Sequence, residues 1–269
     1  MNEVTKIDGI GSSVRRTEDK KFLTGKGRYT DDINRAGQVQ AYFLRSDVAH
    51  AKIKKIDIES AQTAPGVVGV FTGDDISADK VGGPICGWVV PCRDGSATKE
   101  PPHPLLAQGK VRFVGDAIAV VLAETAEQAK SGAELIDVDF EELSPVVDFE
   151  NAGAGAQIHD EVPNNCYFDW ELGDEKATAD ALSGAKKVVK LRVRNNRLVP
   201  NAMEPRSALA EFDSLDDSYT LHTTSQNPHL TRLVLAAFMF AIPESKLRVI
   251  APDVGGGFGS KIYVYIEEA

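Results

Sequence analysis

Near its end the chain reads Ala251-Pro252-Asp253-Val254-Gly255-Gly256-Gly257-Phe258-Gly259-Ser260-Lys261. Four of the five residues from 255 to 259 are glycines. Glycine has no Cβ and adopts positive φ easily, so such a run lets the backbone approach a large ligand and turn its N–H groups toward it. The stretch predicts a ligand-contacting glycine loop; the alternative is a tight turn between two strands.

Two phosphate-binding motifs that also depend on glycine do not fit this loop. A P-loop needs Gly-Lys-Ser or Gly-Lys-Thr, whereas the chain has Gly259-Ser260-Lys261. A dinucleotide-binding fingerprint could use Gly255 and Gly257, but Ser260 stands where its last glycine belongs, and residues 262–269 are too few for the rest of its βαβ unit. The loop therefore predicts a different kind of cofactor site.

The residues ahead of the loop predict a helix and then a strand. Asn227-Pro228 is a helix start, because asparagine caps helices and proline is tolerated at their first position. Residues 246–250 predict a strand that runs directly into the glycines. A buried helical face is predicted from the apolar residues Leu230, Leu233, Val234, Ala237 and Ala241, with Pro243 ending the helix.

Four polar residues near these elements could carry chemistry. The neutral amide of Gln226, just ahead of the helix, can donate to an anionic or oxo ligand without titrating; the alternative is a loop residue bonded to backbone. Glu204 and Arg206 predict either a contact to a ligand edge or, as the favoured interpretation, a local ion pair that locks the turn at Pro205. Asp253 predicts either an acceptor behind the loop or a turn residue.

The rest of the chain predicts an α+β protein with two domains, residues 1–150 and 151–269. An N-terminal arm leads through residue 27 into strands, and Thr125 with Gln128 has the spacing of a capping box at the start of a helix. Residues 151–156 predict a flexible linker. The predicted strands cover 39–43, 53–58, 67–71, 117–122, 138–143, 189–193, 208–212 and 219–224, and the helices 59–64, 126–136 and 176–183.

Residues 73–109 contain several glycines and prolines and no sustained periodicity. Compact domains seldom carry so long an irregular segment without a use, so we expect a functional or docking loop; the alternative is a mobile surface excursion.

Composition excludes several classes of function. With 40 acidic and 30 basic residues the net charge is -10, which disfavours nucleic acid and anionic membranes as partners. The longest apolar run, 233–243, is too short to span a bilayer, and residues 1–6 lack the apolar core of a signal peptide, so we expect a cytoplasmic protein. Three cysteines and five histidines show no metal-ligand spacing, so no side-chain metal site is predicted.

Several motifs, taken in order, resemble the large, molybdenum-binding subunit of the xanthine dehydrogenase and aldehyde oxidase family, most closely its carbon monoxide dehydrogenase branch. The likeness covers nearly the whole chain. Besides the glycine loop, its motifs include Phe22-Leu23-Thr24-Gly25-Lys26-Gly27-Arg28-Tyr29, Ala49-His50-Ala51-Lys52-Ile53, Asn196-Arg197-Leu198-Val199-Pro200, Met203-Glu204-Pro205-Arg206 and Ser225-Gln226-Asn227-Pro228-His229.

The resemblance implies an α/β-hammerhead domain followed by the beginning of a molybdopterin-binding domain. It implies a molybdenum-dependent oxidoreductase that inserts oxygen from water into a substrate carbon, or oxidises carbon monoxide. The cofactor would be molybdopterin cytosine dinucleotide, whose dithiolene holds the metal. Electrons would pass to FAD and [2Fe-2S] clusters on a medium and a small subunit, in a dimer of heterotrimers.

Carried over by motif, Gln226 would donate to an oxo ligand of the metal. The backbone of Gly256, Gly257, Phe258 and Gly259 would contact the metal's ligand sphere.

Two departures from the family pattern qualify this expectation. Purine-oxidising members have a glutamate where this chain has Ile262, which disfavours a purine substrate. The family's later segments, including the general-base glutamate, lie beyond Ala269, so we expect no complete catalytic site, little or no bound cofactor and no activity from these residues alone. The alternative is a free-standing, noncatalytic docking or cofactor-delivery module of the same fold.

Overall fold

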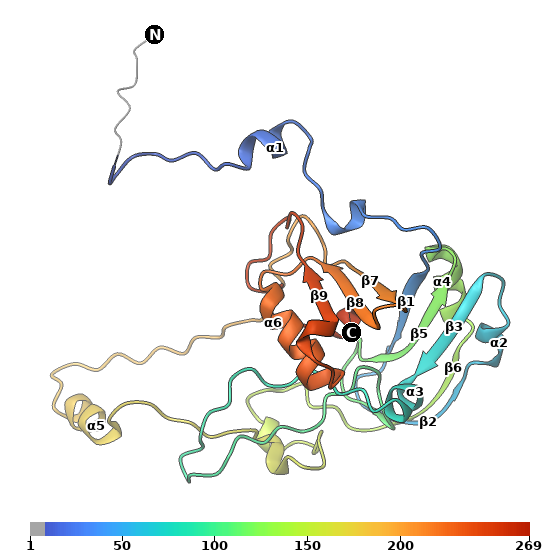
Figure 1. Cartoon of the computed structure of the whole chain (residues 1–269). Helices are drawn as coiled ribbons and strands as arrows, with labels where there is room; N and C mark the ends of the chain where they lie inside the picture. Colours follow the sequence, from blue (N-terminus) through green and yellow to red (C-terminus); the bar gives the residue numbers. More distant parts are fainter. Residues whose placement is uncertain (1–8) are drawn as a thin grey trace.

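The computed structural model describes residues 9–269 (Figure 1). The predicted N-terminal arm is seen from residue 9 onward, and its part over residues 1–8 lies outside the described residues. A short helix, α1 (Asp19–Leu23), interrupts the arm, and a single 3-10 turn (Thr30–Asp32) joins it to the first strand. No helix within residues 9–269 is long and apolar enough to cross a membrane.

The N-terminal half builds two three-stranded antiparallel sheets. The first has the order β1 (Gln40–Arg45), β5 (Ala117–Ala123), β3 (Val67–Thr72), and the second β4 (Lys110–Val111), β2 (Ala51–Asp57), β6 (Asp137–Glu142). The continuous apolar run of β5 is explained by its central place, with Ala119, Val121 and Ala123 fully buried. The short helices α2 (Glu59–Gln62) and α3 (Gly73–Ala78) flank β3.

Helix α4 (Ala126–Ala133) packs on the first sheet, that of β1, β5 and β3, through small side chains. Thr125 caps it as predicted, its hydroxyl accepting from the N–H of Gln128 at 3.2 Å. A Cβ on Gly132 would lie 2.9 Å from Val67 Cγ2, so glycine is what allows helix and sheet to pack this closely.

The segment 73–109, predicted as a functional or docking loop, begins with helix α3 and is otherwise largely irregular. The loop over residues 73–109 packs on the C-terminal half, where the N–H of Gly82 donates to the Met239 carbonyl at 2.7 Å. The predicted flexible linker, residues 151–156, is instead a hydrogen-bonded turn. The Asn165 amide closes it by donating to the carbonyls of Ala152 at 2.9 Å and Ala156 at 2.8 Å.

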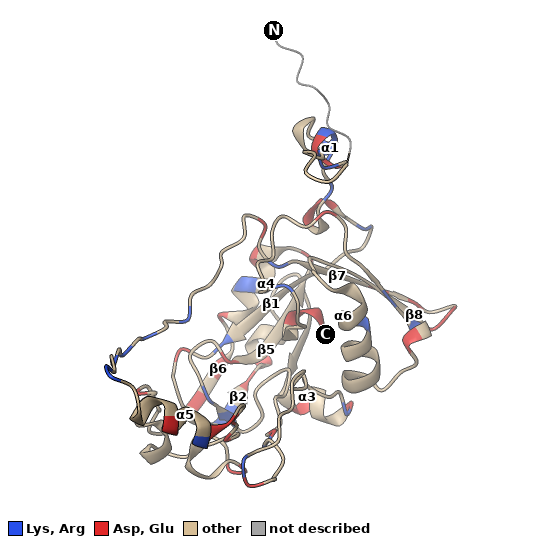
Figure 2. Ribbon diagram, turned by 90° about the vertical axis from the view of Figure 1, so that its left-hand side faces the viewer, with Lys and Arg blue, Asp and Glu red and all other residues tan. Residues whose placement is uncertain are grey.

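The prediction of a strand over residues 189–193 is wrong. Helix α5 (Glu175–Ser183) forms as expected, capped by Asp174 and ended by Gly184, but residues 184–207 then run back to the body as an irregular chain, exposed as far as residue 201 (Figures 1 and 2). Val189 and Leu191 are 79% and 82% exposed. Apolar alternation makes a strand only where a neighbouring strand accepts its backbone hydrogen bonds, and residues 9–269 provide none here.

The third sheet positions the glycine loop. Strands β7 (Ala208–Asp213) and β8 (Ser218–Thr223) are antiparallel, and β9 (Leu247–Ile250) lies parallel to β8. Helix α6 (Pro228–Leu233) and a π-helical segment (Val234–Met239) connect the parallel pair. The loop therefore begins at the carboxyl end of a parallel strand, where α/β folds place their ligands.

The predicted buried face of the connecting helix is only partly right. Leu233 and Ala237 are exposed, while Leu235, Ala236 and Met239 are buried. After Leu233 the cause is the π-helical segment, in which the Phe240 N–H donates to the Leu235 carbonyl five residues back. Its wider turn rotates the following side chains away from the faces that α-helical spacing assigns.

Candidate cofactor site

The glycine loop, residues 255–261, adopts the backbone conformations that its composition predicts. Gly256 and Gly259 have φ of +98° and +91°. Phe258 is also left-handed, with φ of 51°, although it carries a large side chain that is 74% exposed. Such a conformation costs a non-glycine residue about 1–3 kcal/mol and persists only where surrounding contacts impose it.

Consecutive peptide N–H groups at the centre of the loop have no acceptor within the described part of the chain. Within residues 9–269 the N–H groups of Gly256, Gly257 and Phe258 donate to no acceptor, whereas those of Gly255 and Gly259 do. Successive free N–H groups in a loop of alternating backbone handedness bind anionic or oxo groups.

Gln226 lies directly against this part of the loop. Its Oε1 accepts from the Gly259 N–H at 2.9 Å, and its own N–H donates to the Lys261 carbonyl at 2.8 Å. A Cβ on Gly257 would lie 2.3 Å from Oε1, so the third glycine makes room for this glutamine. Because the Gln226 Oε1 already accepts this hydrogen bond, the Nε2 group is the part of the side chain that can donate to a ligand. Within the described part of the chain, Nε2 makes no hydrogen bond.

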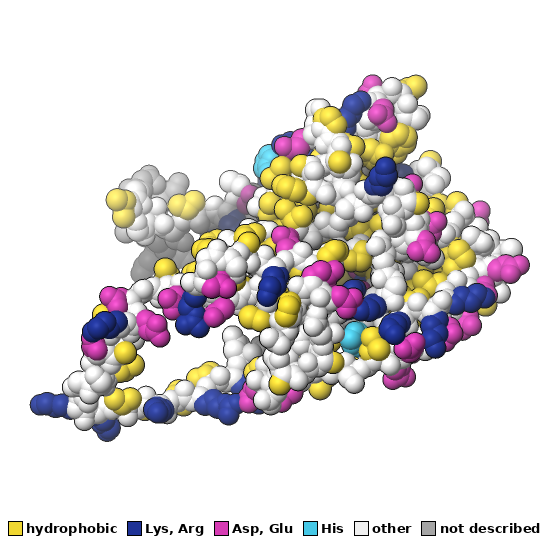
Figure 3. All heavy atoms as spheres, turned by 90° about the horizontal axis from the view of Figure 1, so that it is seen from below, with side chains coloured by type: hydrophobic (Ala, Val, Ile, Leu, Met, Phe, Trp, Pro, Cys, Tyr) yellow, Lys and Arg dark blue, Asp and Glu magenta, His cyan; other side chains and the backbone are white. Residues whose placement is uncertain are grey.

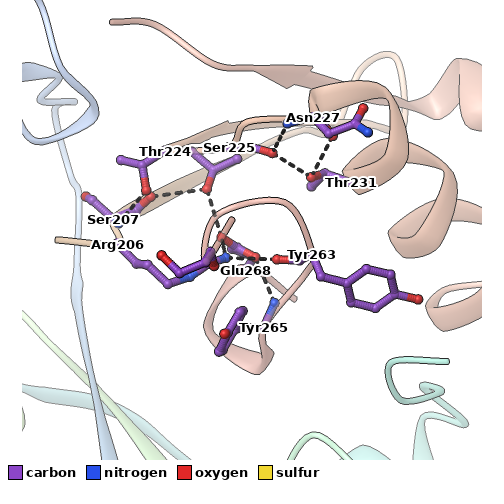
Figure 4. A network of polar contacts seen from close by, with 11 residues as sticks. Arg206, Ser207, Thr224, Ser225, Asn227, Thr231, Tyr263, Tyr265 and Glu268 are labelled. Carbon is purple, nitrogen blue, oxygen red and sulfur yellow. Dashed lines mark hydrogen bonds and ion pairs between the residues drawn. The ribbon is translucent and has the colours of Figure 1, made fainter. Parts of the chain in front are cut away.

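Residues on either side of Gln226 hold it at the start of α6. The Asn227 side chain accepts from the Leu230 N–H, and the Asn227 N–H donates to the Ser225 hydroxyl at 3.0 Å (Figure 4). Ser225 is also hydrogen-bonded to Thr231, hydroxyl to hydroxyl, at 3.0 Å. Gln226 is therefore anchored by both neighbours and by the loop.

The expected ion pair between Glu204 and Arg206 is not formed. Glu204 pairs with Lys261 at 3.1 Å instead, and Arg206 pairs with Glu268. The residues near Pro205 thus hold the glycine loop and the segment after it rather than locking their own turn. Lys261 and Glu268 are functional candidates that sequence reasoning missed, and the only signal was their position shortly after the glycines.

Arg206 organises the segment that follows the loop (Figure 4). Its guanidinium donates to the carbonyls of Ser260 at 2.8 Å and Tyr263 at 3.2 Å, and it lies 4.0 Å from the ring centroid of Tyr265. Its partner Glu268 is almost fully buried and also accepts from the Thr223 hydroxyl at 3.1 Å. This network joins the end of the loop to β8.

Asp253 is an acceptor behind the loop, one of the two roles considered for it. Its carboxylate accepts from Lys21 Nζ at 2.6 Å and from the Arg28 N–H at 2.7 Å, and its own N–H donates to the Arg28 carbonyl. The hydrogen bond from Lys21 and then that from Arg28 hold the pKa of Asp253 below its ordinary value. The N-terminal arm is thereby attached immediately ahead of the glycines.

Neither the side chains nor the thiols of the described residues suggest a protein-held metal. Within residues 9–269 no group of three or more histidine, cysteine, aspartate or glutamate residues is arranged to bind one, and Cys86, Cys92 and Cys166 are free.

A groove of about 750 Å³ lies beside the segment after the loop. One side comes from residues 84–105 and the other from residues 263–267. Hydrophobic side chains lie exposed between charged ones on the face seen from below (Figure 3). Apolar residues that line the groove include Pro84, Leu105, Phe113, Tyr263 and Val264.

Comparisons with known proteins agree with this arrangement. The sequence model described as aldehyde oxidase and xanthine dehydrogenase, a/b hammerhead domain, matches residues 24–144, and that of the molybdopterin cofactor-binding domain matches residues 158–269. The expected α+β fold, a hammerhead domain followed by the start of a molybdopterin-binding domain, is confirmed.

Among curated relatives, the nicotine 6-hydroxylase large subunit of Paenarthrobacter nicotinovorans is 35% identical over 96% of this chain and 31% of its own length. The carbon monoxide dehydrogenase large chain of Afipia carboxidovorans is 34% identical over 97% of this chain and 32% of its own length. The solved structure of quinoline 2-oxidoreductase from Pseudomonas putida 86 superposes with a TM-score of 0.82 at 36% identity, covering 96% of this chain and 32% of that one. The chain spans about a third of the length of these relatives.

Proposed function

The chain belongs to the xanthine dehydrogenase and aldehyde oxidase family, where it matches the N-terminal part of molybdenum hydroxylase large subunits, and we propose that it forms one wall of a molybdenum cofactor site. One observation carries the proposal: Gln226 lies against Gly257, beside the free N–H groups of residues 256–258. These donors fit the oxygen ligands of a molybdenum centre, and glycine at 257 makes room for the Gln226 side chain beside them.

In this proposal the chain's residues orient and stabilise rather than transfer protons. The Gln226 Nε2 group would donate to an oxygen ligand of the metal, and the N–H groups of Gly256, Gly257 and Phe258 would donate to other acceptor atoms of the cofactor. Gly259 fixes the glutamine by occupying its Oε1. Bound at this wall, the cofactor supplies the redox chemistry of hydroxylation with oxygen from water.

We further propose the molecular context that the family implies. The cofactor is molybdopterin cytosine dinucleotide, and electrons pass to flavin and iron–sulfur subunits in a cytoplasmic dimer of heterotrimers. The hammerhead domain ends near residue 150. The substrate is carbon monoxide, an aldehyde or an N-heterocycle and not a purine, because Ile262 replaces the glutamate of purine-oxidising members.

Titration of the ¹⁵N-labelled chain with molybdate tests the cofactor-wall proposal by NMR. We expect shifts confined to the amides of residues 256–258 and the Gln226 side chain, and their loss in Gly257→Ala. Gly184→Ala serves as the control, because an added Cβ there makes only ordinary contacts. Absence of these shifts, or shifts centred elsewhere, contradicts the proposal and favours the docking or delivery module.

A further inference from the structure

We propose that Glu204 and Lys261 form a buried clamp that holds both ends of the glycine loop and so shapes the ligand-binding backbone before any ligand arrives. In this role Glu204 is a positioning residue. What the shaped loop binds rests on the proposed function above, whereas the clamp itself does not.

The carboxylate of Glu204 joins the first and last residues of the loop. Its Oε2 accepts from the Gly255 N–H at 2.6 Å and from Lys261 Nζ at 3.1 Å. Lys261 Nζ also donates to the Glu204 carbonyl at 2.7 Å, and the Glu204 N–H donates to the Gly255 carbonyl at 3.3 Å. One residue outside the loop therefore fixes both of its ends.

Burial makes these contacts more directional than those of a surface ion pair. The Lys261 side chain is only 2% exposed and that of Glu204 only 12%. Any rotamer that separated the two groups would leave a buried charge without a partner, which costs much free energy. Each side chain is therefore held in the arrangement that keeps the pair together. Glu204 also packs closely on the loop backbone, because a Cβ added to Gly255 would lie 2.5 Å from Glu204 Cβ.

The loop needs such a restraint because it carries strain at its tip. Phe258 is left-handed, and its ring is too exposed for packing to impose that conformation. The contacts that restrain the backbone around Phe258 are the clamp, the hydrogen bond between Gln226 and Gly259, and the turn in which the Ser260 N–H and hydroxyl donate to the Gly257 carbonyl at 3.0 and 2.7 Å. Lys261 joins the clamp to Gln226, since its carbonyl accepts from the Gln226 N–H.

Amide hydrogen exchange measured by NMR tests the clamp in the 269-residue chain. Lys261→Met keeps the aliphatic stem but removes the charge, and Glu204→Gln removes the opposite charge. We expect about tenfold faster exchange or more at the Gly259 and Gln226 amides in both variants, as the loss of a charged hydrogen bond predicts. Neither amide touches the mutated side-chain groups, so faster exchange there reports loop shape.

Controls separate this role from general destabilisation. Lys261→Arg retains the charge and should restore slow exchange, and Lys52→Met removes a surface pair of similar length, 3.0 Å to Glu141, without affecting the loop. Unchanged exchange at Gly259 and Gln226, or an equal increase at the Val121 amide in β5, overturns the proposal. If Glu204→Gln does not fold, Lys261→Met and Lys261→Arg decide. The exchange result stands even if molybdate does not bind.

Discussion

At the residue scale, Gly257 shows most directly how side-chain size controls the candidate site. In Gly257→Ala the new Cβ would meet Gln226 Oε1, Cδ and Cγ within 2.6 Å, so the glutamine must move and release Gly259. We expect faster amide exchange at Gly259 and a loss of about 1–3 kcal/mol in the free energy of unfolding, as for other overpacking substitutions. Urea denaturation measures the second quantity; an alanine variant as stable as Gly184→Ala would refute the steric argument.

The attachment of the arm at Asp253 should depend on pH. The pKa of this carboxyl is lowered in the folded protein, so its contribution to stability is present above the unfolded-state pKa of about 4 and is lost as pH falls through the lower folded-state value. We expect the Arg28 amide shift to stay constant from neutral pH down to about 4 and to change below it. In Asp253→Asn this shift should be altered already at neutral pH; a wild-type shift in that variant would show that the carboxylate does not hold the arm.

Sequence reasoning located Gln226 and the glycines because each signal is local: a glycine run, and a glutamine ahead of a capped helix. Their proximity, though not their roles, is now seen directly. It failed for Glu204 and Arg206, which it paired with each other. Their actual partners lie 57 and 62 residues away, and only the folded sheet brings them together.

At the element scale, the contrast between local sequence signals and contacts between distant residues explains which strands and helices were predicted correctly. Helix α4 carries its own start signal in Thr125 and Gln128, and β5 carries a continuous apolar run, so both were found. The segment 189–193 has the alternation of a strand but no neighbour to pair with among residues 9–269. The π-helical segment after α6 has no sequence signature that periodicity can reveal, and it displaced the predicted buried face.

Matched substitutions test this assignment of the exposed segment. Val189→Ser should change the free energy of unfolding by less than about 0.5 kcal/mol, because that side chain is 79% exposed. Val121→Ser, at a fully buried position of β5, should cost roughly 3 kcal/mol by leaving a cavity and burying a hydroxyl. Chemical denaturation compares the two; equal losses would mean that residues 189–193 are packed.

At the scale of the whole molecule, the sequence before residue 184 and the sequence after residue 207 contact each other directly. These contacts are additional to the irregular segment 184–207 that connects the two halves, here called the connecting segment. The Tyr263 hydroxyl donates to the Ile85 carbonyl at 2.5 Å, Gly82 bonds to Met239, and Arg45 pairs with Glu267. These contacts join the loop over 73–109 and the first sheet to the C-terminal half.

Limited trypsin digestion should therefore nick the chain without separating it. The basic residues of the connecting segment are exposed and lie outside regular structure, so we expect early cleavage between residues 186 and 197. The two large products should co-elute in size-exclusion chromatography and separate only in urea, with mass spectrometry identifying the cut. Separate elution without denaturant would show that the contacts between the halves are too weak to hold them.

The bond between Lys21 and Asp253 also has a consequence for the order of assembly during translation. Its partners are 232 residues apart, so the ribosome adds that many residues after Lys21 before the arm has a place to attach. At typical elongation rates the arm waits on the order of 10–50 s after its own synthesis. The sheets of the hammerhead domain are complete by residue 142 and can fold during that interval, so the arm is made before these sheets but is fixed after them.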